Sequence, residues 1–260
     1  MAPRLWSCFR NKHAGLPAEE EEAAAAEGPV LVEMFASQAC AASPGAELVL
    51  SRLGRGDFQL PVPVVLLGFH VDYWDYMGWK DPYGSAHWTV RQKAYVQALG
   101  LDTLFTPQVV VQGQAHLHGN DDTALVSAIT SAPRFPALTF QATFSRPTSV
   151  CLEVTLNGEL RTKVENVGVD VMVALYESGL VTDCPRGQNK GRVLSNDYVV
   201  RRLEKLCTVK DHPARKPVSG TINFSLWKSF NSSRCGVAVF VQSSSHRIFG
   251  SQNFNLPYDI

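Results

Sequence analysis

The stretch around Cys40 most constrains the fold, because there a lone cysteine separates two apolar segments of different character. Residues 30–35 form a nearly continuous apolar run, which predicts a short buried strand. After the cysteine, apolar residues recur at helical spacing as far as Leu53, and Pro44 falls in the first turn, where its missing N–H is tolerated. We therefore expect Cys40 beside a helix N-terminus, where free N–H groups and the helix dipole favour the thiolate over the thiol.

Strand and helix patterns alternate through the rest of the first half. Residues 62–69 and 105–111 are apolar runs typical of strands covered on both faces. Residues 85–99 and 120–129 begin with capping residues and continue at helical spacing. This order predicts an α/β domain over residues 30–134, with a central sheet and flanking helices.

The second half has a different pattern of apolar residues. Short apolar or alternating runs predict strands, at residues 137–144, 149–156, 169–176, 221–226, 236–242 and 247–254. One amphipathic helix is expected over residues 196–207, because Tyr198, Val199, Leu203 and Leu206 would share a face. Residues 135–260 are thus predicted to form an antiparallel, β-rich, sandwich-like domain with one helix.

Charge and the N-terminal residues exclude several classes of protein. The chain has 24 Lys and Arg against 24 Asp and Glu, so no overall charge favours a nucleic-acid partner. Residues 1–29 are rich in acids and alanine and are expected to form a disordered tail. They resemble neither a signal nor a transit peptide, so a cytoplasmic location is expected. No run reaches the ~18 apolar residues of a transmembrane segment.

Four segments resemble the motifs of one known family. They read EMFASQACAASP (residues 33–44), HVDYWDYMGWKDP (70–82), TPQVVV (106–111), and GQNKGR followed by NDYVVR (187–201). The chain is similar in these segments to the domain-of-unknown-function family 1223, a thioredoxin-like group without an assigned biochemical role. The resemblance implies a thioredoxin-like fold for residues 30–134 and a site at Cys40, but it names no substrate. Within the last segment, Asn189 and Arg192 are expected to clasp the first half rather than to catalyse.

The sequence departs from the family pattern at Ser43, which stands where many members have a second cysteine of C-x-x-C. A serine hydroxyl cannot attack a mixed disulfide, so a dithiol cycle confined to this motif is unavailable. Monothiol chemistry remains, with Cys40 as nucleophile, Ser43 hydrogen-bonded to the thiolate, and protein thiols or glutathione as partner or co-substrate. Cys184 is a candidate distant resolving thiol. The rival hypothesis is a non-catalytic binding or scaffold protein that retains the fold.

Pro107 is expected to shape a substrate groove. In thioredoxin-like folds a cis proline precedes a central strand and faces the redox cysteine, leaving backbone groups of the preceding residue, here Thr106, free to pair with a substrate. Gln38, Tyr73 and Trp74 complete the expected groove. The alternative is that the aromatic side chains pack over the end of the sheet.

Asp72 admits three interpretations. It could cap a turn, it could tune the thiol or relay protons in the groove, or it could bind a metal together with His70, which lies two residues away on one strand face. No recognisable ligand spacing supports the metal, so none is assigned and no cofactor is expected. The oligomeric state stays open.

Overall fold

The computed structural model describes residues 27–161, 168–210 and 215–260. The expected tail over residues 1–29 lies almost wholly outside these ranges, and Glu27 already pairs with Pro136 in an isolated antiparallel bridge. The helices and 3-10 turns of the described residues are α1 (Ser43–Arg55), α2 (Ala86–Ala98), α3 (Asp122–Thr130), η1 (Asp75–Met77) and η2 (Ser232–Arg234). None of the helices in the described ranges is both long and apolar enough to cross a membrane.

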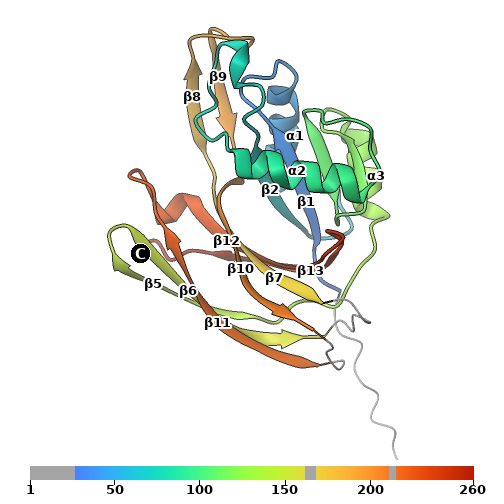
Figure 1. Cartoon of the computed structure of the whole chain (residues 1–260), viewed down its shortest axis with the longest axis vertical. Helices are drawn as coiled ribbons and strands as arrows, with labels where there is room; N and C mark the ends of the chain where they lie inside the picture. The colour runs from blue at the N-terminus through green and yellow to red at the C-terminus, as the bar shows by residue number, and fades with distance from the viewer. Residues whose placement is uncertain (1–26, 162–167, 211–214) are drawn as a thin grey trace, which may run out of the picture.

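Thirteen strands lie in the described residues (Figure 1). Those of the first half are β1 (Val30–Ala36), β2 (Val64–His70), β3 (Gln108–Val111) and β4 (Ala115–His118). Those of the second half are β5 (Gln141–Thr148), β6 (Cys151–Leu160), β7 (Val169–Glu177), β8 (Leu180–Cys184), β9 (Arg192–Asn196), β10 (Val199–Val209), β11 (Lys216–Ser225), β12 (Cys235–Ser243) and β13 (Ile248–Asn255).

One eight-stranded mixed sheet runs through both halves of the chain, in the order β13-β12-β7-β10-β2-β1-β3-β4. β1 and β2 are parallel, whereas β3 and β4 join antiparallel at the β1 edge. The two halves meet where β10 pairs with β2 through Val199 and Gly68, and Gly68 N–H donates to the Tyr198 carbonyl at 2.7 Å. The expected boundary between residues 134 and 135 therefore separates two segments of chain that share one sheet.

The prediction of a helix over residues 196–207 is wrong, because this segment contains strand β10. β10 pairs antiparallel with β7 along its whole length. Two register shifts, between Val200 and Arg202 and between Lys205 and Cys207, interrupt the ladder. Each bulge inserts a residue and moves the apolar positions off strict alternation, so the strand imitates a helical period.

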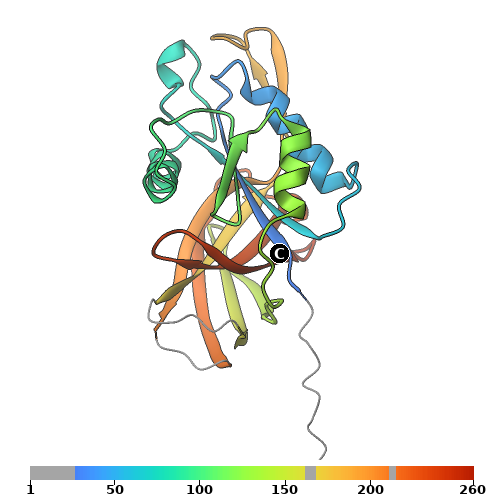
Figure 2. The same ribbon diagram turned by 90° about the vertical axis from the view of Figure 1, so that its right-hand side faces the viewer.

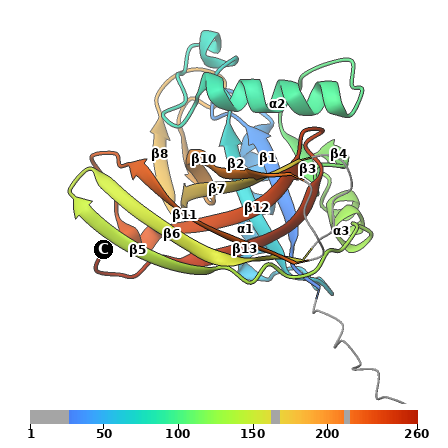
Figure 3. The same cartoon turned by 60° about the horizontal axis from the view of Figure 1, so that its bottom comes forward.

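Three layers enclose the large sheet. α1 and α3 pack on one face of β1–β3 through residues such as Leu50 and Ile129, and α2 packs on the opposite face through Trp88 and Tyr95 (Figure 2). A second sheet, β11-β6-β5, covers β7 and β12 with an apolar core that includes Leu152 and Val239 (Figure 3). The antiparallel β-rich character expected of the second half is thus present, with part of it built into the large sheet.

The β8–β9 hairpin stands apart from both sheets and lies alongside α1 (Figure 1). β8 and β9 pair antiparallel from Leu180–Asn196 to Cys184–Arg192. Their connection, residues 185–191, is the segment that resembles the second-half motif. The hairpin carries this connection onto the turn that contains Cys40.

Candidate functional site

Cys40 lies in the tight connection from β1 to α1. Its N–H donates to the Ser37 carbonyl at 3.0 Å, and its own carbonyl accepts from the Ser43 N–H at 3.4 Å. α1 begins at Ser43, with Pro44 in the first turn and no side-chain cap on its N-terminus. The thiol is therefore held one turn from a helix start whose N–H groups are not capped by a side chain, although only 5% of the residue is exposed.

The Thr106–Pro107 peptide lies against the Cys40 sulfur. This peptide bond is cis, and the Cys40 Sγ donates to the Thr106 carbonyl oxygen at 3.7 Å. The Thr106 hydroxyl accepts a hydrogen bond of 2.7 Å from Trp74 Nε1. Three segments that are distant in the sequence thus meet at the sulfur.

Tyr73 completes this cluster from the aromatic segment after β2. Burial raises the pKa of Tyr73 to about 12, and the neighbouring Cys40 adds to the shift through its charge. Gln92 and Thr106 lie near the Tyr73 hydroxyl and partly offset this rise, but no hydrogen bond of good geometry reaches the hydroxyl among the described residues. It therefore stays protonated at neutral pH and is available as a donor beside the thiol. Trp74 stacks on the exposed Tyr76, which extends the aromatic surface outward.

Ser43 and Gln38 have other partners than expected. The Ser43 hydroxyl accepts from the Ser37 N–H at 3.1 Å, so it braces the turn instead of facing the thiolate. The Gln38 side chain is buried, and its amide donates to Thr182 at 3.1 Å and to Asn196 at 2.7 Å. Gln38 thus ties the Cys40 turn to the β8–β9 hairpin.

Asp72 has its partner on α2. Its carboxylate accepts from the Thr89 hydroxyl at 2.6 Å, and its N–H donates to the same hydroxyl at 3.3 Å. This contact anchors Asp72 to α2, and no hydrogen bond joins Asp72 to Cys40 or His70 among the described residues. The role of Asp72 therefore stays a prediction.

The connection between β8 and β9 clasps the Cys40 turn. The buried Asn189 amide donates to the carbonyls of Gln38 at 2.8 Å and Cys40 at 3.0 Å. Gln188 Oε1 accepts from the Ala41 N–H at 2.9 Å. Arg192 donates to the Asn189 side chain at 2.9 Å and so orients it. The clasp expected from the sequence is present.

All five cysteines in the described part of the chain are free, with Cys40, Cys184 and Cys235 buried. Cys184 lies at the end of β8, and its Sγ donates to the Arg186 carbonyl at 3.2 Å. Its role as a resolving thiol stays a prediction.

His70 belongs to a buried group of charged side chains under the turn. His70 Nδ1 lies 2.7 Å from Asp81, and Nε2 lies 3.3 Å from Glu47. Burial lowers the pKa of His70, but the carboxylates of Asp81 and Glu47 outweigh it and raise the pKa to about 10. His70 is therefore an imidazolium at neutral pH. Within the described residues no group of three potential ligands is arranged to hold a metal ion, and His70 already has two carboxylate partners.

Sequence reasoning overlooked Glu47, and it expected Asp81 to cap a turn and bond backbone but not to pair with His70. Asp81 Oδ2 accepts from the Gln38 N–H at 2.7 Å as well as binding His70, so it supports the Cys40 turn directly. Glu47 could have been found by its spacing, because Ser43, Glu47 and Ser51 recur every four residues and form a polar stripe on a helix whose other buried residues are largely apolar.

Two solved structures resemble this fold along most of their length. Protein AGR_C_4864 from Agrobacterium tumefaciens is 25% identical, with a TM-score of 0.62, over 88% of this chain and 96% of that one. HBP35 of Porphyromonas gingivalis is 14% identical, with a TM-score of 0.60, over 88% of this chain and 76% of that one. No curated protein matches the sequence significantly. Residues 31–242 match the family described as protein of unknown function DUF1223, and the chain therefore belongs to that family.

Proposed function

We propose that this protein is a thioredoxin-like monothiol oxidoreductase that exchanges disulfides at Cys40. The observation that carries the proposal is the position of the Cys40 Sγ, 3.7 Å from the Thr106 carbonyl and one turn before α1. Backbone N–H groups at a helix start favour a thiolate. A Cys40 thiolate no longer donates to the Thr106 carbonyl, which is then available to pair with an extended thiol substrate. These are the two requirements of the expected site.

The reaction follows from Ser43, which leaves the motif with one thiol. The Cys40 thiolate attacks the glutathione sulfur of a protein–glutathione mixed disulfide, and the protein leaves as a thiolate that takes a proton from water. A second glutathione thiolate then attacks the Cys40–glutathione disulfide. Glutathione disulfide is released and the Cys40 thiolate is restored, so one free glutathione is oxidised for each protein thiol regenerated.

Tyr73 takes the role that the sequence suggested for Ser43. Its hydroxyl is unpartnered among the described residues and stays protonated, so it can donate to the thiolate or to the leaving sulfur. Trp74, fixed by its bond to Thr106, forms one wall for the incoming substrate. The reaction needs abundant reduced glutathione, which is in keeping with a cytoplasmic protein.

The test is turnover of a glutathionylated peptide in the presence of glutathione, followed by the formation of glutathione disulfide. We expect activity in the wild type and none in Cys40→Ser, with Cys151→Ser as a matched control that keeps full activity. Tyr73→Phe should lower kcat by about tenfold or more, as expected for loss of one hydrogen bond to a charged sulfur. Equal rates in wild type and Cys40→Ser would favour the non-catalytic alternative, a binding or scaffold protein.

A further inference from the structure

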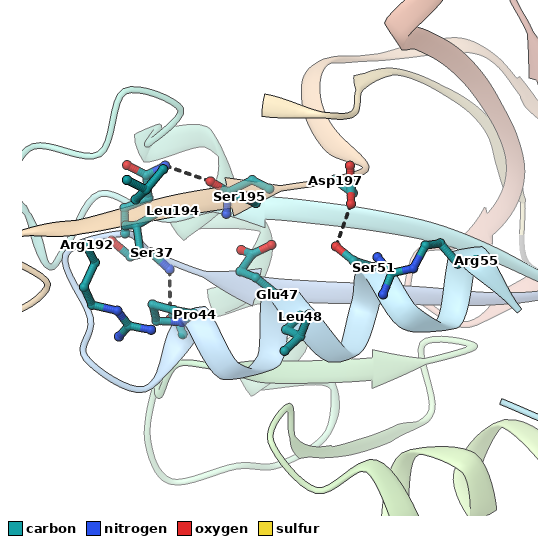
Figure 4. A pocket seen from close by; sticks show the side chains of 14 residues that line it. Ser37, Pro44, Glu47, Leu48, Ser51, Arg55, Arg192, Leu194, Ser195 and Asp197 are labelled. Atoms are coloured by element: carbon teal, nitrogen blue, oxygen red, sulfur yellow. Dashed lines mark hydrogen bonds between the residues drawn. The ribbon is translucent and has the colours of Figure 1, made fainter. Parts of the chain in front are cut away.

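A cavity of about 330 Å³ lies between α1 and β9, on the side of the Cys40 turn that faces the β8–β9 hairpin (Figure 4). This volume is within the range of small-molecule sites in proteins, which start at roughly 300 Å³. One wall is the polar stripe of α1, which consists of Ser43, Glu47, Ser51 and Arg55. The facing wall is β9 and includes Arg192 and Asn196.

Glu47 is the unusual member of this lining. It is 3% exposed, and its Oε2 has no hydrogen-bond partner among the described residues. Its Oε1 lies 3.3 Å from Nε2 of the His70 imidazolium, which also pairs with Asp81 at 2.7 Å, so one positive charge serves two buried carboxylates. Burying a carboxylate in this way is costly unless a donor reaches it, so its placement at the middle of the cavity points to a ligand (Figure 4).

The other acid in the lining is already satisfied. Asp197 accepts from the Ser51 hydroxyl at 2.6 Å with one oxygen and from the Gly179 N–H at 2.7 Å with the other. The hydrogen-bonding capacity left in the cavity is therefore that of Glu47, supplemented by nearby hydroxyls. A protonated amine matches this set, because it offers three donors and one positive charge.

The rim of the cavity is positively charged, in contrast to Glu47 at its middle. Arg192 lies at the end of the cavity near Pro44 (Figure 4), is exposed, and donates from Nη1 to the neutral Asn189 side chain. Arg55 lies toward the other end and pairs with Asp57 at 3.1 Å. Arg192 thus retains guanidinium donors that suit a carboxylate, and the two arginines together repel polycations.

We propose that this cavity binds a small zwitterion of the amino-acid type, with its ammonium group on Glu47 and its carboxylate toward Arg192. The site is separate from the chemistry proposed for Cys40, although Ser37, Gln38 and Ser43 of the same turn line it. A divalent cation fits less well, because no group of three ligating side chains exists among the described residues.

Isothermal titration calorimetry with the common free amino acids and 4-aminobutyrate tests the assignment on the full chain. We expect at least one to bind the wild type, and its N-acetyl and carboxamide derivatives to bind about tenfold or more weakly, because each removes one charged partner. Cys40→Ser should bind normally, so a failure of the thiol proposal leaves this result unaffected. Binding of an N-acetyl derivative equal to that of its parent, or no binding by any of the probes, would overturn the proposal.

Variants of Glu47 and Arg192 test separately the contacts proposed for the ammonium group and the carboxylate of the ligand. Glu47→Gln keeps the shape and should lose binding by about tenfold or more, whereas Asp102→Asn makes the same charge change at an exposed site and should not alter it. Arg192→Gln lies at an exposed position and should weaken the zwitterion but not a matching simple amine. Circular dichroism checks the fold of Glu47→Gln. If that variant unfolds, Arg192→Gln decides, and undiminished zwitterion binding by it contradicts the assignment.

Discussion

The two ends of the large sheet are stabilised in different ways. Where β11-β6-β5 covers β7 and β12, the side chains packed between the sheets are hydrophobic, and the buried Glu177, the last residue of β7, pairs with Arg201. Around β1 and β2, by contrast, buried charges lie on both faces of the sheet. His70 is held with Asp81 and Glu47 near α1, and Glu33 on β1 is paired with Arg91 of α2 at 2.7 Å.

This difference favours the β1–α1 region as the place of the proposed chemistry. Burial of apolar side chains stabilises a fold directly. A buried ion pair stabilises it only when the pair's geometry offsets the cost of removing both charges from water. Several buried ion pairs in one region are therefore more typical of a functional site than of a structural core. The β-rich half contributes to the site mainly through the β8–β9 hairpin, whose Asn189 holds the Cys40 turn. We therefore regard the second half as the frame and the β1–α1 region as the site.

The largest expected effect is a dependence of stability on pH that arises at His70. Its pKa of about 10 in the fold exceeds the ordinary 6.5, so the folded state binds more protons between these values. This contribution is fully present below pH 6.5 and is lost as the pH rises toward 10. It amounts to up to about 5 kcal/mol. Urea unfolding from pH 6 to 10 should show the decline, and His70→Gln should flatten it; an unchanged slope in the variant would contradict the assignment.

The substitution Arg91→Met is expected to have the next largest effect on stability. It leaves Glu33 buried without its cation, which should lower the free energy of unfolding by about 3–5 kcal/mol. The double variant Glu33→Gln with Arg91→Met should recover part of the loss. Denaturant titration measures both, and equal stability of the single and double variants would show that the pair is not coupled.

Leu152→Ala makes the matched change in the apolar core. Leu152 is fully buried in β6, so its truncation should cost about 3 kcal/mol through lost transfer energy and the cavity left behind. Unlike the His70 contribution, this cost should be the same at pH 6 and pH 9. A clear pH dependence would remove the distinction between the two ends.

Asn189→Ala is expected to have the smallest effect on stability, about 1–2 kcal/mol, because two carbonyls lose their donor. Its local consequence is larger, since the Cys40 turn is released from the hairpin. Hydrogen exchange at residues 37–42, measured by mass spectrometry, should accelerate in this variant. Protection equal to that of the wild type would mean that the hairpin does not hold the turn.

Local patterns in the sequence predicted much of the first half. The strand, cysteine and helix around Cys40, the Ser85 cap of α2 and the Asp121 cap of α3 follow from short-range signals. The helical pattern after Cys40 stops at Leu53, and α1 ends close by at Arg55, with Gly56 as its C-cap. Gly54 has a packing role that no local signal indicates, because a Cβ there would lie 1.8 Å from the Tyr198 hydroxyl.

Long-range features could not be predicted in the same way. β10 was mistaken for a helix because two bulges disturb its alternation, and only its pairing with β7 determines its state. Likewise, no local signal indicates that β10 joins β2, or that Glu47 faces His70 from a different element. Ser43 lay at the expected position, but its hydrogen bond depends on the fold of the turn.

The most direct test of the central claim compares Cys40 with a better exposed thiol in the same molecule. The native protein is treated with glutathione disulfide, and mixed-disulfide formation is followed for each cysteine by peptide mass spectrometry. Accessibility alone would favour Cys151, which is partly exposed, over Cys40, which is 5% exposed. We predict that Cys40 reacts first because its surroundings activate it. Faster reaction at Cys151, with Cys40 left unmodified, would contradict the account.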